Sequence, residues 1–327
     1  MSVQARRAVF RQTGGPEVIE WEDVTLPAPG PGEALVRHEA VGLNFIDTYF
    51  RSGLYPASLP SPLGGEAAGV VEAVGEGVTD VAVGDRVAYA TGGLGAYATA
   101  RVVGAQFLVK LPDAVSFEDA AAVMLKGLTV QYLFRRTVPI GPGSTVLFHA
   151  AAGGVGLIAC QWARSEGIRL IATAGSAEKR ALALEHGASE ALDYHAEGLP
   201  AQVRELTGGR GVDVVMDGVG RDTFIMSLDC LRPLGMMISF GNASGKVEPF
   251  DLGLLAAKGS LYVTRPTLAW HASDAASLRA MAADLFEKVE SGAVQVRIDQ
   301  RVALADAAEA HRALQARETT GSTVLIP

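Results

Sequence analysis

Two hydrophobic patterns divide the chain. In the N-terminal part, short apolar or alternating runs such as EALVRHEAVG (33–42) and DRVAYA (85–90) are separated by glycine- and proline-rich turns, for example 27–32. Short β-rich runs bounded by turn residues at this spacing are typical of a small barrel or sandwich. We therefore expect a mostly-β unit at the start of the chain.

The pattern changes at Ser116, where FEDAAAVMLKGLTVQYLFRR predicts a helix with Ser116 as N-cap and Asp119 at the third helical position. Beyond this helix, helical segments alternate with the apolar runs TVLFHA, RLIATA, EALDY, VDVVMD, GMMISFG and SLYVT. Strands that alternate with helices predict a doubly wound parallel sheet. The expected fold class is therefore α/β.

The C-terminal part lacks this alternation. After Arg265-Pro266 come the helical segment DAASLRAMAADLFEKVESG and a few shorter pieces, which we assign back to the first domain. The predicted organisation is one domain formed by 1–126 and 265–327, with a dinucleotide-binding domain inserted at 127–264.

Composition and charge narrow the class of protein. A chain of 327 residues exceeds what one core usually fills, and the net charge of -8 argues against a nucleic-acid partner, which needs a surplus of Lys and Arg. No apolar run is long enough for a membrane span, and no secretory pattern opens the chain. We expect a cytoplasmic protein in which Cys160 and Cys230 are buried thiols.

A glycine-rich turn follows the first apolar run of the second pattern. It reads Ala151-x-Gly153-x-x-Gly156 and lies between a predicted strand and a predicted amphipathic helix, as a dinucleotide fingerprint requires. A backbone approach to pyrophosphate and close helix packing would explain the glycines, and the helix N-terminus would face the phosphate charge. The predicted cofactor contacts here are Gly153, Gly154, Val155 and Gly156. The alternative is that the glycines serve only a tight turn.

The residues after the next apolar run indicate which dinucleotide binds. NAD-preferring proteins place Asp or Glu about 20 residues past the turn to hold the ribose 2′-hydroxyl, whereas this chain has Gly175-Ser176. A small hydroxyl followed by Lys179 and Arg180 would accept a 2′-phosphate, and Tyr194 would cover the adenine ribose or its phosphate. We therefore predict NADPH, with Lys179 as a solvated helix charge as the alternative reading.

The run GGEAAGVVEAVG (64–75), followed by GDRV (84–87), resembles the medium-chain dehydrogenase/reductase superfamily. The zinc alcohol dehydrogenases of that superfamily carry GHE here, with the His as one zinc ligand and a Cys upstream as another. This chain has Gly65 in the His position and Asn44 in the region of the Cys. A catalytic zinc needs three protein ligands, and the scattered histidines and two cysteines supply no such set. We expect no metal.

Segments throughout the chain are similar to the NADPH-dependent quinone oxidoreductases, the zinc-free group that includes zeta-crystallin. These segments are GLNFIDTYFRSGLYP, MLKGLTVQYLF, FHAAAGGVGLIACQWA, VGRDTFIMSLDCL, SFGNASG and GSLYVTRPTL. The resemblance implies a GroES-like, mostly-β catalytic domain plus a Rossmann domain. It also implies an enzyme that transfers a hydride or electrons from NADPH to a quinone, an acceptor that needs no metal activation.

The same resemblance assigns residues on the acceptor side. Asn44, Asp47, Tyr49 and Tyr55 would line the cleft beside the nicotinamide, where Asn44 or a tyrosine hydroxyl could hydrogen-bond a quinone oxygen. Core packing is the alternative for the tyrosines, and Asp47 is expected to position the loop. Arg265 would lie at the rim of the cleft.

On the cofactor side, the resemblance carries Thr129, Phe240, Gly241 and Asn242 to the nicotinamide region and Leu268 to the rim. Lys126 and Arg317 are either ligand contacts or solvated charges. The resemblance further implies a homodimer in which two copies of the GSLYVT strand pair, which would cover an exposed sheet edge.

Two other functions remain open. Zinc-free relatives also reduce carbon–carbon double bonds of enoyl or alkenal substrates with NADPH, and Tyr49 or Tyr55 would then act as the general acid. A binding or structural role is the third reading, because zeta-crystallin serves as a lens and RNA-binding protein. The acidic net charge weighs against RNA here.

Overall fold

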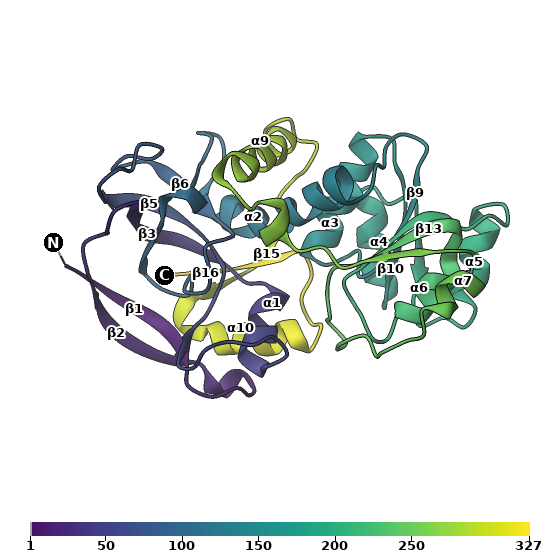
Figure 1. Ribbon diagram of the computed structural model, residues 1–327, viewed down its shortest axis with the longest axis horizontal. Helices are drawn as coiled ribbons and strands as arrows, with labels where there is room; N and C mark the ends of the chain where they lie inside the picture. The colour runs from purple at the N-terminus through teal and green to yellow at the C-terminus, as the bar shows by residue number, and fades with distance from the viewer. Residues whose placement is uncertain (1) are drawn as a thin grey trace. The chain divides into compact units, whose positions relative to one another are not determined.

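The computed structural model describes residues 2–327, which form two compact units (Figure 1). The first unit contains the N-terminal segment up to Leu128 together with Ala272–Ser291 and Val296–Pro327. The second unit contains Thr129–His271 and Gly292–Gln295. Each unit is described by itself below.

The first unit is built on two β-sheets. The smaller sheet has the strand order β2 (Glu20–Leu26), β1 (Val3–Phe10) and β4 (Ser61–Pro62). The larger runs β15 (Ile298–Ala303), β16 (Ser322–Ile326), β3 (Glu33–Gly42), β5 (Glu66–Val74), β6 (Arg86–Tyr89) and β8 (Val109–Lys110), and β7 (Ala100–Gly104) pairs with β3. Figure 1 shows the yellow C-terminal strands beside the purple N-terminal ones, and β16 pairs antiparallel with β3. The end of the chain therefore completes the fold of its beginning.

The part of α2 (Phe117–Tyr132) up to Leu128 belongs to this unit, whose other helices are short apart from one. They are α1 (Phe45–Ser52), α9 (Ala275–Glu290) and α10 (Ala307–Gln315), with 3-10 turns at Pro16–Val18, Ala105–Phe107 and Leu304–Asp306. The core between sheets and helices includes Phe10, Leu63, Tyr89, Tyr97 and Leu325, all fully buried. Burial of side chains of this size contributes about 1.5–3 kcal/mol each. Ala34, Val36 and Val41 of β3, the strand that precedes α1, are part of this core.

The second unit contains a six-stranded parallel sheet with the order β11-β10-β9-β12-β13-β14. Its strands are β9 (Thr145–Phe148), β10 (Arg169–Ala174), β11 (Glu190–Asp193), β12 (Val212–Asp217), β13 (Leu231–Ser239) and β14 (Tyr262–Thr264). The direction of winding reverses between β9 and β12, and doubly wound sheets bind their ligands at the carboxyl ends of the strands beside such a switch point. The predicted doubly wound sheet is confirmed.

Helices connect these strands and flank the sheet (Figure 1). They are α3 (Gly154–Ser165), α4 (Ala177–Glu185), α5 (Leu199–Leu206), α6 (Phe224–Cys230), α7 (Gly253–Ala257) and α8 (Leu268–His271). The helix α2 (Phe117–Tyr132) precedes them and continues as a π-helical turn at Leu133–Thr137. The Asp119 amide donates to the Ser116 hydroxyl at 3.0 Å, so the predicted N-cap is confirmed.

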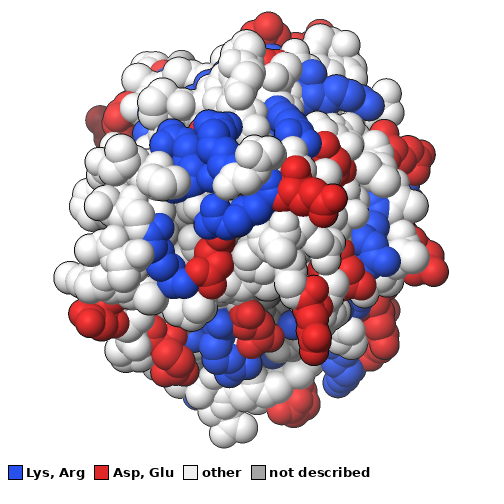
Figure 2. All heavy atoms as spheres, turned by 90° about the vertical axis from the view of Figure 1, so that its right-hand side faces the viewer, with Lys and Arg blue, Asp and Glu red and all other residues white. Residues whose placement is uncertain are grey.

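The cysteines and the surface agree with an ordinary globular chain. Cys160 and Cys230 are buried, and burial raises the pKa of each thiol to about 12. Among residues 2–327, no helix combines the length and the apolar character needed to cross a bilayer. Figure 2 shows basic side chains on one face of the molecule with acidic side chains close beside them.

Candidate active site

The glycine turn of the second unit joins β9 to α3. Gly153 is the N-cap residue of α3, and the helix begins at Gly154. A Cβ on Gly156 would lie 2.4 Å from the Cα of Ala151, so the close packing of helix on strand requires glycine there. A Cβ on Gly153 would meet nothing closer than the Ala150 carbonyl oxygen at 3.4 Å. The fold itself therefore does not require Gly153, whereas a ligand lying against the backbone would.

This turn fits a dinucleotide pyrophosphate. The first-turn amides of a helix have no intrahelical acceptor and, with the helix dipole, favour an anionic group. Gly154 and Val155 supply such amides at the start of the 12-residue helix α3. The reading of the glycines as a tight turn alone explains Gly156 but not Gly153.

The predicted 2′-phosphate residues come together after β10. Ser176 is the N-cap of α4, and its hydroxyl accepts from the Lys179 amide at 3.2 Å. A Cβ on Gly175 would lie 3.1 Å from Tyr194 Cε1 and 3.3 Å from His195 Nε2. Gly175, Ser176, Lys179 and Tyr194 thus surround one helix N-terminus that has no acidic residue at the end of β10.

Asp193 and His195 at this place were missed by the sequence analysis, as was the pairing of Asp193 with Arg180. The Arg180 guanidinium pairs with Asp193 at 2.8 Å, and the His195 ring packs against the Tyr194 ring with centroids 4.0 Å apart. Hydrogen bonding from the His195 backbone amide and the charge of Arg180 lower the pKa of Asp193. Asp193, the last residue of β11, is therefore already paired with a cation. The adjacent Asp193-Tyr194-His195 sequence was the only available signal.

The turn after β13 carries the residues predicted for the nicotinamide side. The Phe240 amide donates to the Asp217 carbonyl at 2.8 Å, and the Phe240 ring packs on Phe148. Arg265 donates from Nη1 to the Ser239 hydroxyl at 2.9 Å and to the Gly241 carbonyl at 2.8 Å. Arg265 therefore holds the turn that contains Phe240, Gly241 and Asn242.

Asp217 organises the neighbouring loop and was not foreseen from the sequence. One of its carboxylate oxygens accepts from the Val219 and Gly220 amides at 2.7 and 3.0 Å, and the other accepts from the Thr223 and Ser227 hydroxyls at 2.6 and 3.2 Å. The ring of the fully buried His149 extends this network, with Nε2 lying 2.9 Å from the Ser227 hydroxyl. Burial lowers the pKa of His149, so the ring acts as a neutral hydrogen-bonding group.

The remaining predicted cofactor residues are placed as follows. Thr129 is buried on α2, Leu268 is half-buried at the start of α8, and Asn242 is buried. Arg317 is exposed just beyond α10 in the first unit and has a left-handed backbone, with φ of 61°. Of these residues, Asn242 adjoins the turn held by Arg265.

In the first unit, Asn44 and Asp47 form the N-terminal cap of α1. The backbone N–H of Asn44 donates a hydrogen bond to Asp47 Oδ2 at 2.9 Å. The Tyr97 hydroxyl donates to the same oxygen at 3.0 Å. Asp47 is fully buried, and burial raises its pKa to about 7. These contacts are those of a positioning residue.

A directional chain of hydrogen bonds ends at Asp47. Arg51 Nη1 lies 3.1 Å from His311 Nδ1, and His311 Nε2 lies 3.0 Å from the Tyr97 hydroxyl. Burial lowers the pKa of His311 to about 3, so the ring is neutral. Since a guanidinium can only donate, Nδ1 is the acceptor and Nε2 carries the proton. Arg51 therefore donates to His311, His311 donates to the Tyr97 hydroxyl, and this hydroxyl donates to the Asp47 carboxylate.

The two predicted tyrosines pack against each other. The ring centroids of Tyr49 and Tyr55 are 5.2 Å apart in an edge-to-face arrangement, and Phe50 packs on Tyr55 at 5.7 Å. Tyr49 is 7% exposed, whereas Tyr55 is half-buried. This aromatic cluster serves packing, and the half-buried Tyr55 ring retains a surface on which a flat ligand could stack.

Glu66 joins Asn44 to α2. Its carboxylate accepts from Asn44 Nδ2 at 2.7 Å and from the Leu125 amide at 2.5 Å, and Lys126 Nζ lies 3.5 Å away. Burial raises the pKa of Glu66, and the charge of Lys126 opposes this shift. Lys126 is only 6% exposed, so the reading of Lys126 as a solvated charge is wrong. An acid within the apolar run after Gly65 was the sequence signal for this cluster.

The donors at this place do not fit a catalytic zinc. Asn44 offers an amide, Gly65 has no side chain and Lys126 is a cation, whereas zinc takes Cys, His or carboxylate ligands. Over residues 2–327, no group of three or more His, Cys, Asp or Glu side chains could hold a metal ion.

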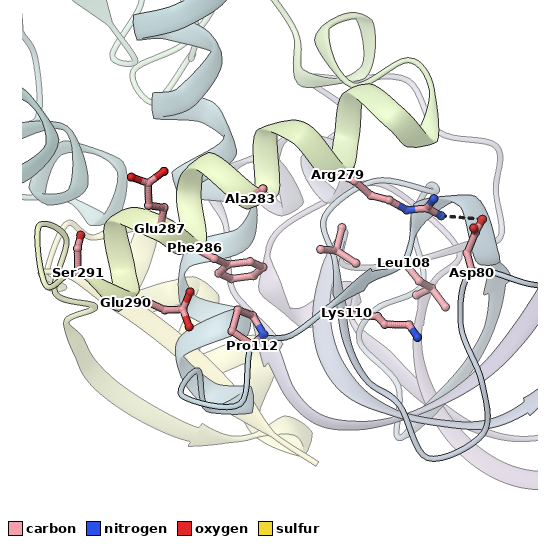
Figure 3. Close-up of a pocket in the computed structure, with 11 residues that line it drawn as sticks. Asp80, Leu108, Lys110, Pro112, Arg279, Ala283, Phe286, Glu287, Glu290 and Ser291 are labelled. Atoms are coloured by element: carbon pink, nitrogen blue, oxygen red, sulfur yellow. Dashed lines mark ion pairs between the residues drawn. The ribbon is translucent and has the colours of Figure 1, made fainter.

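A separate hollow of about 670 Å³ lies between α9 and β8 in the first unit (Figure 3). Phe286 points into it from α9, and Arg279 pairs with Asp80 at its edge at 2.8 Å. Leu108, Val109 and Pro112 supply the opposite apolar wall. The predicted site residues are not among those that line it.

Comparison with known proteins confirms the resemblance. The family model described as alcohol dehydrogenase GroES-like domain matches residues 30–113, and the one described as zinc-binding dehydrogenase matches 154–271. The chain is 58% identical to a quinone oxidoreductase of Pseudomonas aeruginosa over 99% of its own length and 100% of that protein. It is 42% identical to a 2-haloacrylate reductase of a Burkholderia species, covering 98% of each chain.

A solved structure gives the same picture. The Escherichia coli quinone oxidoreductase in complex with NADPH superposes with a TM-score of 0.97 at 50% identity, covering 98% of this chain and 100% of that one. Identity at this level across the whole length shows common descent as well as a common fold. The chain therefore belongs to the quinone oxidoreductase family of the medium-chain dehydrogenase/reductase superfamily.

Proposed function

We propose that this protein is an NADPH-dependent quinone oxidoreductase that reduces quinones without a metal ion. The observation that carries the proposal is the end of β10. There, Gly175 and Ser176 replace an acid, and Lys179 and Tyr194 gather around a helix N-terminus. This arrangement favours a phosphorylated ribose, because a charge-assisted bond to Lys179 replaces the repulsion that a carboxylate would exert.

The second unit binds and orients the cofactor. Bound NADPH supplies a hydride, which an electron-poor quinone accepts without a Lewis acid. The α3 N-terminus and the uncrowded Gly153 would hold the pyrophosphate. Arg265 and Asp217 fix the two adjoining loops at the carboxyl ends of β12 and β13 by the hydrogen bonds described above. Their proposed role is to fix the orientation of the reacting ring.

The first unit supplies the groups for the acceptor. The side-chain amide of Asn44 has two N–H donors. One donates to Glu66, so the other can donate to a quinone oxygen. Tyr55 can stack on a flat ring. Asp47, held by Tyr97 and the α1 cap, fixes the start of α1, the helix that lies between Asn44 and Tyr55 in the chain.

A second candidate activity is reduction of a carbon–carbon double bond, favoured by the similarity to the 2-haloacrylate reductase. That reaction needs a proton donor at carbon after hydride arrives. Tyr49 is nearly fully buried in the aromatic cluster, which leaves Tyr55 as the candidate donor. The quinone reading needs no such donor at carbon and is the one we prefer.

A comparison of acceptors separates the two activities. NADPH oxidation is followed with 1,4-benzoquinone, 9,10-phenanthrenequinone, a 2-alkenal and an enoyl-CoA. We expect turnover with the two quinones. Activity confined to the alkenal and the enoyl-CoA would overturn the quinone assignment, and tighter calorimetric binding of NADH than of NADPH would overturn the cofactor assignment.

We also propose a homodimer in the cytoplasm. The edge strand β14 presents Tyr262 at 56% exposure, and pairing of two copies would cover that edge. The two inert thiols suit a reducing compartment. Light scattering at micromolar concentration should give twice the 34.1 kDa chain mass; a monomeric mass would refute the dimer. Cell fractionation tests the location.

A further inference from the structure

Lys126 is a buried cation whose hydrogen-bonding capacity is not used. Its side chain is 8% exposed, and its nearest carboxylate oxygen, Glu66 Oε2, is 3.5 Å from Nζ. That distance gives charge attraction without a well-formed hydrogen bond. Within the part of the chain that the structure describes, Nζ has no hydrogen-bond partner. An ammonium carries three donors, and buried donors of this kind normally have acceptors.

Glu66 cannot satisfy these donors by a small movement. Its Oε1 accepts from the Leu125 amide at 2.5 Å, and its Oε2 accepts from Asn44 Nδ2 at 2.7 Å. Both oxygens are therefore held by groups attached to α2 and to the α1 cap. Glu66 balances the charge of Lys126 but leaves the ammonium in need of another acceptor.

The cluster of Asn44, Glu66 and Lys126 is tightly packed at Gly42 and Gly64 but has open space at Gly65. A Cβ on Gly42 would lie 2.2 Å from Glu66 Oε2 and 2.3 Å from the Ala121 carbonyl, and a Cβ on Gly64 would lie 2.1 Å from the Tyr97 ring. A Cβ on Gly65 would meet no atom within 4 Å. Space for an incoming group therefore adjoins Gly65, directly before Glu66 in the chain.

We propose that Lys126 is a further catalytic residue, whose ammonium donates a hydrogen bond to a carbonyl oxygen of the acceptor that enters at Gly65. This rests on the proposed quinone reductase function. The acceptor gains a hydride, that is, two electrons and one hydrogen nucleus, from NADPH, and one of its oxygens bears a negative charge until a proton from water completes the hydroquinone. The positive charge of Lys126 stabilises that oxygen as the charge develops.

The proposal explains the choice of residues around Lys126. Asn44 and Lys126 would present two donors toward the acceptor, with Glu66 holding both side chains in place. A cation positioned in this way performs the polarising task that a metal ion performs elsewhere. Gly65 then serves as the specificity-determining position, since any side chain there would occupy acceptor space.

The test compares Lys126→Met with Lys126→Arg and with Lys110→Met, an exposed lysine of the same unit. Turnover is measured with tetrachloro-, unsubstituted and tetramethyl-1,4-benzoquinone at saturating NADPH. We expect Lys126→Met to lose about 100- to 1000-fold in kcat with the tetramethyl quinone, the range for loss of one oxyanion donor. The loss with the tetrachloro quinone should be far smaller, because that acceptor needs less polarisation.

The proposal is decided by how the loss of kcat in Lys126→Met varies among the three quinones. Partial recovery in Lys126→Arg and unchanged rates in Lys110→Met complete the expected result. Equal losses for all three quinones, or no loss, would overturn the proposal, because a purely structural role moves every acceptor alike. An unmodified enzyme that is inactive with every quinone would instead refute the proposed function. NADPH affinity, followed by intrinsic fluorescence, shows whether each variant is folded.

Gly65→Val provides a second test that does not depend on the stability of the lysine variants. The position is uncrowded and has no left-handed backbone, so we expect unchanged thermal stability and NADPH affinity. The KM for a bulky bicyclic quinone should rise by about tenfold or more, as for a few added methyl groups in a binding pocket. An unchanged KM would show that the acceptor does not enter at Gly65.

Discussion

The two units differ in the kind of groups that form the candidate site of each. In the second unit, the proposed ligand contacts are mostly backbone groups: the helix N-termini of α3 and α4 and the turn after β13, held by Arg265 and Asp217. In the first unit, they are side chains of a buried network that joins Asn44, Glu66 and Lys126. A site formed by backbone groups tolerates substitutions that preserve its turns. Loss of one residue from a buried charge network, by contrast, leaves the remaining charges without partners and destabilises the protein.

Loss of the counter-charge to Lys126 should give the largest effect. Glu66→Gln leaves the buried ammonium of Lys126 without the carboxylate that is paired with it, and breaking a buried pair in this way costs about 3–5 kcal/mol of unfolding free energy. Urea denaturation measures it. The control is Glu118→Gln on α2, the helix that carries Lys126; it removes an exposed partner of Arg301 and should cost no more than about 1 kcal/mol. Similar losses in both variants would remove the contrast between the two kinds of site.

The pH dependence of stability tests the buried character of Asp47. Burial raises the pKa of Asp47 from 3.8 to about 7 in the folded protein. Between these values the native state binds a proton that the unfolded chain has released, so this group makes unfolding easier as pH rises, and its contribution levels off above pH 7.

Asp47→Asn removes this titration. Relative to the unmodified protein, the variant should gain stability between about pH 4 and pH 7, on the order of 3 to 4 kcal/mol. Urea denaturation across that range, with Asp306→Asn at the exposed start of α10 as control, measures the difference. A pH-independent difference would show that Asp47 is ionised at an ordinary pKa.

Lys179→Ala tests the candidate cofactor site of the second unit at the lysine in the first turn of α4. A lost charge-assisted bond to the 2′-phosphate is worth about 1.5–3 kcal/mol, or roughly 10- to 100-fold in the KM for NADPH. The KM for NADH should change little. Equal effects on both cofactors would place the 2′-phosphate elsewhere.

Substitutions of Gly153 and Gly156, in the turn between β9 and α3, should separate an effect on stability from an effect on cofactor binding. Gly156→Ala places a Cβ 2.4 Å from the Ala151 backbone and should destabilise the protein by about 1–3 kcal/mol. Gly153→Ala has only a 3.4 Å neighbour and should leave the melting temperature unchanged. Its NADPH affinity should fall by roughly tenfold, the equivalent of about 1.4 kcal/mol. Retained affinity in Gly153→Ala would favour the tight-turn reading.

The sequence was sufficient for the second unit because its signals are local. The strand and helix alternation and the glycine turn each involve neighbours in the chain, and each appears as expected. The Arg180–Asp193 pair was missed because it joins the first turn of a helix to the end of the next strand. Periodicity does not show which charges meet across such a gap.

The first unit was harder to predict because its contacts span long stretches of sequence. Tyr97 meets His311 across 214 positions, and Leu125 meets Glu66 across 59. Asn44 and Asp47 were identified by resemblance to a family, but the sequence did not show that Glu66 and Lys126 would complete their cluster. Their burial follows from tertiary packing alone.

The inert thiols described above make the protein convenient for site-directed labelling. Because Cys160 and Cys230 are buried, with pKa values raised to about 12, thiol-reactive dyes and spin labels should not react with them at neutral pH. A single cysteine introduced at the exposed Tyr262 would therefore carry the label in an otherwise native background. Dipolar coupling or excimer emission between two such labels would report directly on edge-strand pairing.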